Sequence, residues 1–298
     1  MSGPLYIAGP TACGKSAVAL ELARQTAGEI ITVDSMQVYR GLDIGTAKPS
    51  EADRAAHAHH LLDCSAVENP FDAAAFVRLA KMAQADITAR GKRPIYCGGT
   101  GFYFTALLEG LGDAPGPDRA LRAQLEETDT PSLLEELQRG DPATLARIDR
   151  QNRRRLIRAV EVLRLTCRAP STQRAVWGAG AHKNFFVLSR KRDDLRARVD
   201  ARVEAMFAAG LIEETRALAP QLGANPAAAQ AVGYRQVLEH LRGERDLPGT
   251  MTAVKLATWR LVRRQTTWWR KYHPAPWLFV PAGESPGESA RRVLEQVE

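Results

Sequence analysis

The chain has 298 residues, of which 45% are hydrophobic and 25% are charged, and its net charge is +7. This composition excludes a disordered, collagen-like or coiled-coil chain, and no apolar run approaches the ~18 residues of a membrane span. The four cysteines lack the spacing of a metal site or a disulfide framework, and no secretion signal precedes them, so we expect a reduced, cytoplasmic protein without membrane contact.

The first hundred residues alternate between strand-like and helix-like stretches. We predict strands at residues 5–8, 29–33 and 94–97, each apolar and each followed by a glycine or polar turn. The spacing of apolar side chains predicts helices at residues 16–23 and 72–89. Strand, glycine turn, helix and strand in this order are typical of a buried parallel sheet, so we predict an α/β fold.

From about residue 115 the pattern becomes helical. We predict helices at residues 121–137, 142–148 and 150–166, and strand character returns only at 185–188 and 277–280. Residues 191–273, between these last two strands, are mostly helical in pattern. The sequence therefore predicts one α/β core, made of residues 1–112 and 185–298, interrupted by an all-helical insertion domain at residues 113–184.

Residues 9–16 match the phosphate-loop pattern G-x-x-x-x-G-K-[ST] between a predicted strand and a predicted helix. Backbone N–H groups of such a loop form a nest for phosphate oxygens, Lys15 adds a positive charge, and the Ser16 hydroxyl can ligate Mg²⁺. The candidate diphosphate- or nucleotide-binding residues are Gly9, Pro10, Thr11, Ala12, Cys13, Gly14, Lys15 and Ser16. A glycine turn that merely begins a helix is the alternative. The loop suits ATP as well as other diphosphates, so it leaves ATP hydrolysis, kinase chemistry and displacement of pyrophosphate open.

Asp34 follows the second predicted strand, at the sheet edge where α/β proteins build their sites. Three roles compete for its carboxylate: a ligand of Mg²⁺, a general base beside the bound phosphates, or a cap for the next helix. Residues 35–49 are too many for a tight turn, which indicates a loop that contacts a ligand.

A second glycine turn, residues 98–101, follows the third predicted strand at the same edge. Thr100 within it could orient a substrate through its hydroxyl. A plain connection between strand and helix is the alternative.

Basic residues concentrate in the second half of the chain. Residues 1–149 carry a net charge of −6 and residues 150–298 carry +13. This imbalance favours a polyanionic partner, most often nucleic acid, although an enzyme can also segregate charge without one. Arg150, Arg154 and Arg158 recur at helical spacing opposite an apolar stripe, which indicates either an anion-binding face or a solvated helix face.

Residues 251–273 combine six basic side chains with aromatic rings and contain no acid. Guanidinium groups for phosphates and flat rings for unstacked bases suit looped RNA. Because tryptophans at helical spacing more often fill a core, we expect Trp259 and Trp269 to point inward. A third cationic set follows the strand at 185–188 and could face the phosphate loop; it comprises Arg192, Arg196, Arg198 and Arg202.

Nearly end to end, the sequence resembles the tRNA dimethylallyltransferases, also called tRNA isopentenyltransferases. The resemblance rests on residues 9–16, 33–49, 59–63, 98–100, 154–162, 232–236 and 263–270. Its most specific block is residues 33–49, VDSMQVYRGLDIGTAKP. One departure is Gln151-Asn152, where the family usually has Asn-Asp before its arginines.

The resemblance implies transfer of a dimethylallyl group from its diphosphate to N6 of adenosine 37, beside the tRNA anticodon, with release of diphosphate. It implies a P-loop, nucleotide-kinase-like core and a helical insertion domain that contacts the tRNA anticodon stem-loop. Mg²⁺ is then the cofactor and dimethylallyl diphosphate the co-substrate. The zinc finger of eukaryotic relatives is absent, so a bacterial-type enzyme is implied, and we expect it to act as a monomer.

Carried over residue by residue, Asp34 matches the family's general base, and Lys15 and Thr100 join it as candidate catalytic residues. Arg202 matches an arginine associated with the prenyl diphosphate. The positions that match tRNA-contacting sites are Asp34, Ser35, Met36, Gln37, Thr100, Arg122, Arg154, Arg155, Leu156, Ile157, Arg158, Gln230, Ala231, Val232, Gly233, Tyr234, Arg235, Arg263, Arg264, Gln265, Thr266, Thr267, Trp268, Trp269 and Arg270.

Two other functions fit part of the sequence. A P-loop small-molecule kinase would use Asp34 as the base for an acceptor hydroxyl, but it leaves the basic half without a role. A nucleic-acid-binding NTPase without transfer chemistry would need a further acid to hold Mg²⁺, and only one predicted strand ends in Asp.

Overall fold

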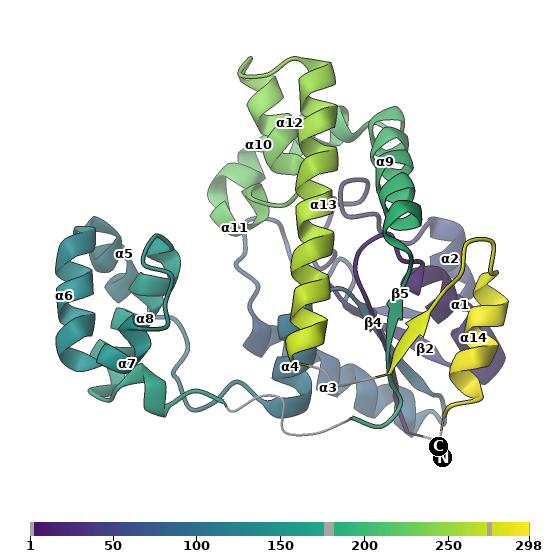
Figure 1. Cartoon of the computed structure of the whole chain (residues 1–298), viewed down its shortest axis with the longest axis horizontal. Coiled ribbons are helices and arrows are strands. Elements are labelled where there is room, and N and C mark those ends of the chain that lie inside the picture. The colour runs from purple at the N-terminus through teal and green to yellow at the C-terminus, as the bar shows by residue number, and fades with distance from the viewer. Residues whose placement is uncertain (1–2, 176–181, 273–275, 298) are drawn as a thin grey trace. The chain divides into compact units, whose positions relative to one another are not determined.

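The computed structural model in Figure 1 describes residues 3–175, 182–272 and 276–297. The chain divides into two compact units. The core unit combines Met1–Leu108 with Gly178–Glu298, and the insert unit is Glu109–Trp177. The sequence analysis expected the insertion at residues 113–184, so the insert unit begins and ends somewhat earlier than that interval.

The core unit contains a parallel sheet with the strand order β3-β2-β4-β1-β5-β6. Its strands are β1 (Leu5–Ala8), β2 (Glu29–Val33), β3 (His59–His60), β4 (Pro94–Gly98), β5 (Phe185–Ser189) and β6 (Trp277–Phe279). Every strand pairing in this sheet is parallel, as predicted. Strand β3 was not predicted, because its two residues are too few to show a pattern.

The two faces of the sheet bury different side chains. Leu5, Ile7 and Phe186 belong to the cluster that packs against helices α1 (Lys15–Thr26) and α14 (Pro286–Leu294). On the opposite face the ring of Tyr6 stacks between Tyr96 and Phe185, with ring centroids 5.0 and 5.8 Å away. Helices on both faces explain why these strands read as continuous apolar runs rather than as alternating ones.

The core unit contains further helices, of which those at residues 51–56 and 101–109 were not predicted. These further helices are α2 (Glu51–Ala56), α3 (Ala73–Ala89), α4 (Gly101–Glu109), α9 (Arg192–Ala208), α10 (Leu211–Ala224), α11 (Pro226–Ala229), α12 (Tyr234–Leu241) and α13 (Leu247–Tyr272). In Figure 1, α9, α10 and α12 stand above the upper edge of the sheet, and α13 runs from this group down beside the sheet toward α4. Trp269 of α13 is fully buried beside Phe104 and Phe185, as expected, whereas Trp259 is only partly buried.

The insert unit is helical, with a core of leucines that includes Leu125, Leu133 and Leu156. Its elements are α5 (Arg119–Glu127), α6 (Thr130–Gly140), α7 (Pro142–Leu145), α8 (Arg153–Thr166) and a 3₁₀ turn at Pro170–Thr172. The single helix predicted at 121–137 is wrong: it is α5 and α6. The break comes at Asp129, whose Oδ1 accepts a hydrogen bond from Ser132 N at 2.9 Å, with Pro131 in the first turn, where no N–H is needed.

Two other helix boundaries in the insert unit differ from the prediction. Helix α7 ends at Leu145, whereas the pattern extended to residue 148. Helix α8 begins at Arg153 rather than at residue 150, because Asn152 caps it by accepting a hydrogen bond from Arg155 N at 3.2 Å. The Gln151-Asn152 departure from the family pattern therefore retains a capping side chain.

A buried carboxylate fixes the start of β2. The side chain of Glu29 is 2% exposed, yet it contacts Arg90, Lys92 and His60. Lys92 Nζ lies 2.8 Å from Glu29 Oε1, and His60 Nε2 lies 2.7 Å from Oε2. Hydrogen bonds from Arg90, joined by those from Lys92 and His60, hold the pKa of Glu29 well below its usual range although burial opposes them. The basic side chains around Glu29 therefore stabilise the fold by pairing with a buried carboxylate.

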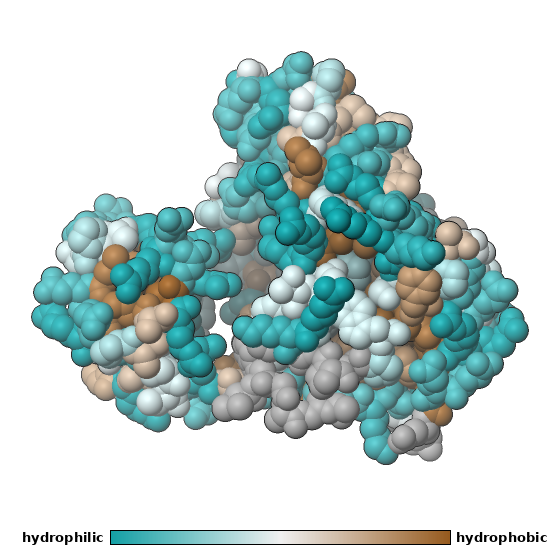
Figure 2. All heavy atoms as spheres, viewed as in Figure 1, coloured by the Kyte–Doolittle hydropathy of each residue, from teal (hydrophilic) through white to brown (hydrophobic). Residues whose placement is uncertain are grey.

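Within the part of the chain that the structure describes, no helix combines the length and the apolar character needed to cross a membrane. Hydrophilic side chains cover most of the face of the core unit seen in Figure 2.

The glycine turn after β4 is required by close packing. A Cβ atom at Gly98 would lie 1.9 Å from the carbonyl oxygen of Val33, on the neighbouring strand β2. The obstacle is backbone in the middle of the sheet, so no side-chain rotation relieves it. Gly98 thus brings the carboxyl ends of β2 and β4 together, which is the edge where Asp34 emerges.

We expect Gly98→Ala to lower the free energy of unfolding by about 3 kcal/mol or more, because the added methyl group forces β2 and β4 apart. Urea unfolding followed by circular dichroism measures this. Gly223→Ala is the matched control: nothing lies within 4 Å of its Cβ position on α10, so helix propensity alone should raise stability by about 0.5–1 kcal/mol. Equal stability of the two variants would contradict the packing argument.

Candidate active site

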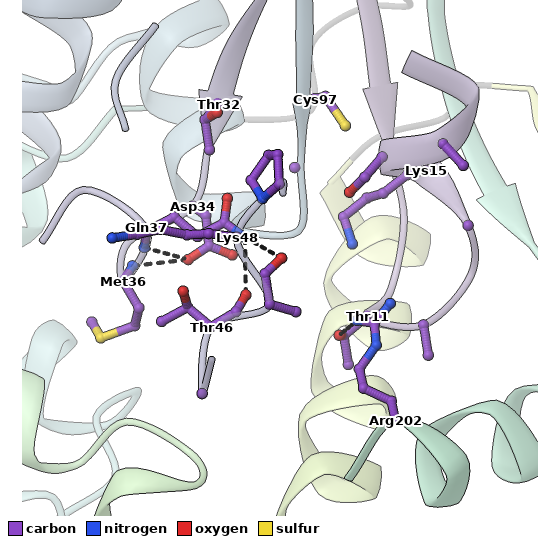
Figure 3. A pocket seen from close by; sticks show the side chains of 18 of the residues that line it. Thr11, Lys15, Thr32, Asp34, Met36, Gln37, Thr46, Lys48, Cys97 and Arg202 are labelled. Carbon is purple, nitrogen blue, oxygen red and sulfur yellow. Dashed lines mark hydrogen bonds between the residues drawn. The ribbon is translucent and has the colours of Figure 1, made fainter. Parts of the chain in front are cut away.

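A cavity of about 620 Å³ opens at the carboxyl ends of β1, β2 and β4, within the core unit. Its lining joins segments that are far apart in the sequence: the phosphate loop after β1, Asp34 after β2, Cys97 of β4, Arg202 of α9 and Gln265 of α13. Figure 3 places Thr11, Lys15 and Arg202 on one side of the cavity and Asp34, Met36 and Gln37 on the other. A site with a cationic and an acidic side can hold two reactants that face each other.

The phosphate loop turns from β1 into α1. Lys15 and Ser16 occupy the first turn of α1, where backbone N–H groups have no partners within the helix. Both residues line the cavity, so these N–H groups and the helix dipole are available to an anion. The ammonium group of Lys15 reaches across the loop to the carbonyl oxygen of Pro10, at 3.3 Å.

Side chains from α13, from α9 and from the connection between β5 and α9 hold the phosphate loop from outside. Arg198 Nε donates to the carbonyl oxygen of Ala12 at 2.9 Å, and Arg190 Nε donates to that of Cys13 at 2.8 Å. Gln265 bridges two segments: its Oε1 accepts from Thr11 N at 2.8 Å, and its Nε2 donates to the carbonyl oxygen of Gly99 at 2.9 Å. The sequence analysis missed Arg190 and matched Gln265 only to a tRNA contact.

Arg202 contacts a polar side chain of the phosphate loop. Its NH1 donates to Thr11 Oγ1 at 3.1 Å. Burial lowers the pKa of this guanidinium, with nearby Arg198 acting in the same direction. Of the third cationic set, Arg198 and Arg202 therefore face the phosphate loop, whereas Arg192 and Arg196 do not: their guanidinium groups lie 5.9 and 5.5 Å from the ring centroid of Trp259.

The Asp34 carboxylate is held by backbone N–H groups of the loop that follows it. Its Oδ1 accepts hydrogen bonds from Met36 N at 2.8 Å and Gln37 N at 3.3 Å. Burial raises the pKa of Asp34, and these N–H groups together with Lys15 offset part of that rise. The helix-cap alternative is wrong, because the next helix, α2, begins only at Glu51.

We call residues 35–49 the rim loop, because several of them line the cavity. The loop is braced by its own side chains: Gln37 Nε2 donates to the carbonyl oxygens of Thr46 and Ala47, at 2.9 and 3.3 Å. Lys48, whose side chain is 1% exposed, contacts the carboxylates of Asp43 and Asp63. Thr100 Oγ1 accepts from Ser35 N at 3.2 Å, so this hydroxyl supports the start of the loop.

Comparisons with known proteins identify the family of this chain. The profile of a family described as IPP transferase matches residues 37–272. A tRNA dimethylallyltransferase of Anaeromyxobacter dehalogenans is 45% identical over 97% of this chain and 98% of its own length. The chain belongs to the tRNA dimethylallyltransferase family.

Solved structures of family members share this fold. The full-length tRNA isopentenylpyrophosphate transferase of Bacillus halodurans is 32% identical, with a TM-score of 0.70 over 99% of this chain and 94% of its own. A eukaryotic dimethylallyltransferase acting on tRNA is 25% identical, with a TM-score of 0.74 over 93% of this chain and 74% of its own. The P-loop core that the sequence predicted is therefore confirmed.

The segment of residues 230–235, which matches a tRNA-contacting segment of the family, is divided between surface and interior. Gln230 and Arg235 are exposed, and Ala231 and Val232 line the cavity. Gly233 is buried at the start of α12. Tyr234 is fully buried, so its side chain serves the interior rather than a bound tRNA.

The second such segment, on α13, also presents only part of its side chains. The exposed residues are Arg263, Arg264, Thr267 and Arg270. Thr266 Oγ1 donates to the carbonyl oxygen of Val262 at 2.9 Å. Trp268 packs against Gly101 and meets Phe102 edge to face, with ring centroids 6.2 Å apart. Trp269 is fully buried, which contradicts its expected tRNA contact.

In the insert unit, a buried acid binds two arginines that match tRNA-contacting sites. Glu161 is 0% exposed, and its carboxylate accepts from Arg122 at 2.9 and 3.0 Å and from Arg158 at 2.6 Å. Burial alone would raise the pKa of Glu161, but the two arginines hold it below its usual value. Sequence reasoning missed Glu161, whose only signal is an acid on the apolar stripe of α8.

The same helix also corrects two expected tRNA contacts. Leu156 and Ile157 are 0% and 6% exposed and belong to the leucine core, so their side chains face inward. Arg154 and Arg155 are exposed. Within residues 154–158, Arg154 and Arg155 are therefore the exposed arginines that do not bind Glu161.

We expect inorganic pyrophosphate to bind the phosphate loop, because N–H groups and Lys15 converge on its cavity. Lys15→Ala should weaken this binding roughly 10- to 100-fold, as expected for loss of a hydrogen bond to a charged group. Isothermal titration calorimetry measures the affinity. Lys81→Ala, which removes an exposed charge from α3, should leave it unchanged, and equal affinities for the two variants would remove Lys15 from the site.

Proposed function

We propose that this protein transfers a dimethylallyl group from dimethylallyl diphosphate to N6 of adenosine 37 in tRNA and releases diphosphate. The observation that carries the proposal is that the phosphate loop and the Asp34 carboxylate line one cavity in a chain of this family. In the reaction the bond between C1 of the prenyl group and the diphosphate oxygen breaks. A bond from C1 to N6 forms, and N6 loses a proton.

The phosphate loop acts on the leaving group. Negative charge develops on the diphosphate as its bond to the allylic carbon breaks, and groups that bind this charge more strongly in the transition state accelerate the reaction. The N–H groups at the start of α1, the ammonium of Lys15 and the guanidinium of Arg202 are placed for this role. Arg198, Arg190 and Gln265 keep the loop in shape, so they are positioning residues.

Asp34 acts on the nucleophile. The amino group at N6 is a poor nucleophile because its lone pair is delocalised into the adenine ring. A carboxylate that accepts its proton contributes typically ~10²–10⁴ in rate. Asp34 Oδ1 is engaged by Met36 N and Gln37 N, and among the described residues no hydrogen bond involves Oδ2, which is thus placed to take the proton.

Mg²⁺ fits the same cavity. Ser16 is exposed there and offers a hydroxyl oxygen, and the Ser or Thr of a phosphate loop commonly ligates Mg²⁺ beside the substrate phosphates. Bound there, the ion would neutralise part of the diphosphate charge. The residue that would hold it is Ser16.

We assign most of the tRNA contacts to residues outside the cavity. Adenosine 37 must leave its stacked position in the anticodon loop, which costs a few kcal/mol. Phosphate contacts from exposed arginines offset this cost. We assign these contacts to Arg154 and Arg155 of the insert unit and to Arg263, Arg264 and Arg270 of α13. Met36 and Gln37, beside Asp34, are placed to contact the adenine.

The cellular location that we propose for the reaction follows from its tRNA substrate. We assign it to the cytoplasm, where tRNA is found. We also propose that the protein acts as a monomer.

We expect Asp34→Asn to lower the rate of transfer by ~10²–10⁴, because the amide keeps the shape of the carboxylate but accepts no proton. Mass spectrometry of tRNA nucleosides measures N6-modified adenosine formed from dimethylallyl diphosphate and Mg²⁺ without ATP. Binding of tRNA should change little, and Asp72→Asn, an exposed cap of α3, serves as the control. Weaker tRNA binding with normal single-turnover chemistry would contradict the role as base.

A parallel assay that contains ATP separates transfer from kinase chemistry. Movement of the terminal phosphoryl group of ATP to an alcohol, with adenine unmodified, would overturn the proposal.

In the wild type, kcat/KM should fall as the pH drops through the pKa of Asp34, because the base must be ionised to accept a proton. Since burial raises that pKa, the fall should come at a higher pH than for a free aspartate.

We expect the double variant Arg154→Ala/Arg155→Ala to weaken tRNA binding and to flatten its dependence on salt. The slope of log K against log salt should fall by roughly 0.7–0.9 for each lost phosphate contact. Filter binding at several salt concentrations measures it. Arg139→Ala/Arg168→Ala removes two exposed arginines from the same unit and should leave the slope unchanged. Equal slopes for the two double variants would place Arg154 and Arg155 on a merely solvated face.

A further inference from the structure

Four hydrogen-bond donors converge on one carboxylate, that of Glu214 on α10. Its Oε2 accepts from Asp43 N at 3.1 Å and from Ile44 N at 2.8 Å. Its Oε1 accepts from Gly45 N at 3.2 Å and from the hydroxyl of Tyr234 at 2.6 Å. Three successive N–H groups of the rim loop thus form a nest of the kind that binds anions, and here an anionic side chain of the protein fills it.

The surroundings of Glu214 keep this contact in one place. Tyr234 is fully buried, and burial together with Glu214 raises the pKa of its phenol, so it remains a donor. A Cβ atom at Gly45 would lie 2.5 Å from the Tyr234 ring, so only a glycine lets the loop approach this closely. Two segments of the family pattern, residues 33–49 and 232–236, therefore meet at this point.

The contact leads directly to the acidic side of the cavity. Gly45, Thr46 and Ala47 line the cavity, and Gln37 Nε2 donates to the carbonyl oxygens of Thr46 and Ala47. The N–H of Gln37 in turn donates to Asp34 Oδ1. Displacement of residues 43–45 would therefore remove support from the Gln37 side chain and weaken one of the two hydrogen bonds that hold Asp34.

The cationic side of the cavity is supported by other residues. Gln265, Arg198 and Arg190 hold the phosphate loop, and none of them contacts Glu214. Loss of the Glu214 contact should therefore disturb one reactant and spare the other.

We propose that Glu214, with Tyr234 as its partner, is a positioning residue that holds the rim loop in the conformation that receives the acceptor base. The identification of that base as adenine rests on the function proposed above. Glu214 touches no reacting atom in this role; it acts through residues 43–47 and Gln37.

Glu214→Gln tests the proposal with little change of shape. Each carboxylate oxygen serves two donors, so a glutamine must present its NH₂ group to one pair of donors whichever way it turns. Glu213→Gln, one residue away, is the matched control, because the Glu213 side chain is 68% exposed and lies 3.8 Å from Arg216 in a surface ion pair of little energetic weight. Tyr234→Phe removes a single donor and keeps the ring beside Gly45.

In steady-state assays, Glu214→Gln should lower kcat/KM for tRNA roughly 10- to 100-fold, while KM for dimethylallyl diphosphate stays within about twofold. Tyr234→Phe should have a smaller effect of the same kind, and Glu213→Gln none. A loss shared equally by both substrates, in proportion to unfolded protein, would show a purely structural role and overturn the proposal. If Glu214→Gln fails to fold, the same split between the two substrates is decided with Tyr234→Phe.

Hydrogen exchange gives a readout that does not depend on activity. Amides of residues 43–47 should exchange roughly 10- to 100-fold faster in Glu214→Gln than in Glu213→Gln, while amides of the phosphate loop should not change. Equal exchange in the two variants would overturn the proposal. If the wild type forms no prenylated adenosine but the exchange difference is found, the proposed function fails and the positioning of the loop stands.

Discussion

A phosphate-binding loop turns N–H groups toward its ligand, so its carbonyl groups point away and need donors of their own. In this protein those donors come from distant parts of the chain: Arg198 for Ala12 and Arg190 for Cys13, both from the segment after β5. Gln265 of α13 completes the arrangement by joining Thr11 to Gly99. The loop is a short local motif, but its shape depends on contacts that the whole core unit must assemble.

Some basic residues form ion pairs inside the protein, whereas others are exposed and available to a polyanion. Glu161 forms ion pairs with Arg122 and Arg158 inside the insert unit, and Glu29 contacts Arg90, Lys92 and His60 at the start of β2. Breaking such a cluster leaves a buried charge unpaired, which is costly. A count of basic residues therefore overstates the surface that can meet RNA, and we assign that surface to the exposed arginines of α8 and α13.

The sequence predicted the parallel sheet and the phosphate loop well, because both depend on local patterns. Apolar runs mark β1, β2, β4 and β5, and the spacing of glycine, lysine and serine defines the loop. It predicted the break between α5 and α6 poorly, since apolar spacing continues across Asp129 and only the cap reveals the interruption. Glu214 was not found, because its partners are 20 and about 170 residues away in the chain and no short motif connects them.

Residues that match the family's tRNA contacts show the same limit. A motif gives positions along the chain but not directions of side chains, so Tyr234, Trp269, Leu156 and Ile157 were grouped with exposed arginines although they are buried. In this structure their side chains pack in the interior.

The ends of the insert unit lie side by side. Gly112 and Arg174 form an antiparallel bridge, and Asp113 N donates to the carbonyl oxygen of Gln173 at 3.1 Å. The insert unit thus begins and ends at neighbouring residues, and it has its own helix caps and leucine core. Lengthening, shortening or exchanging a unit whose two ends are neighbours leaves the register of β4 and β5 intact, so the insert unit can diversify during evolution without disturbing the strands that carry the cavity.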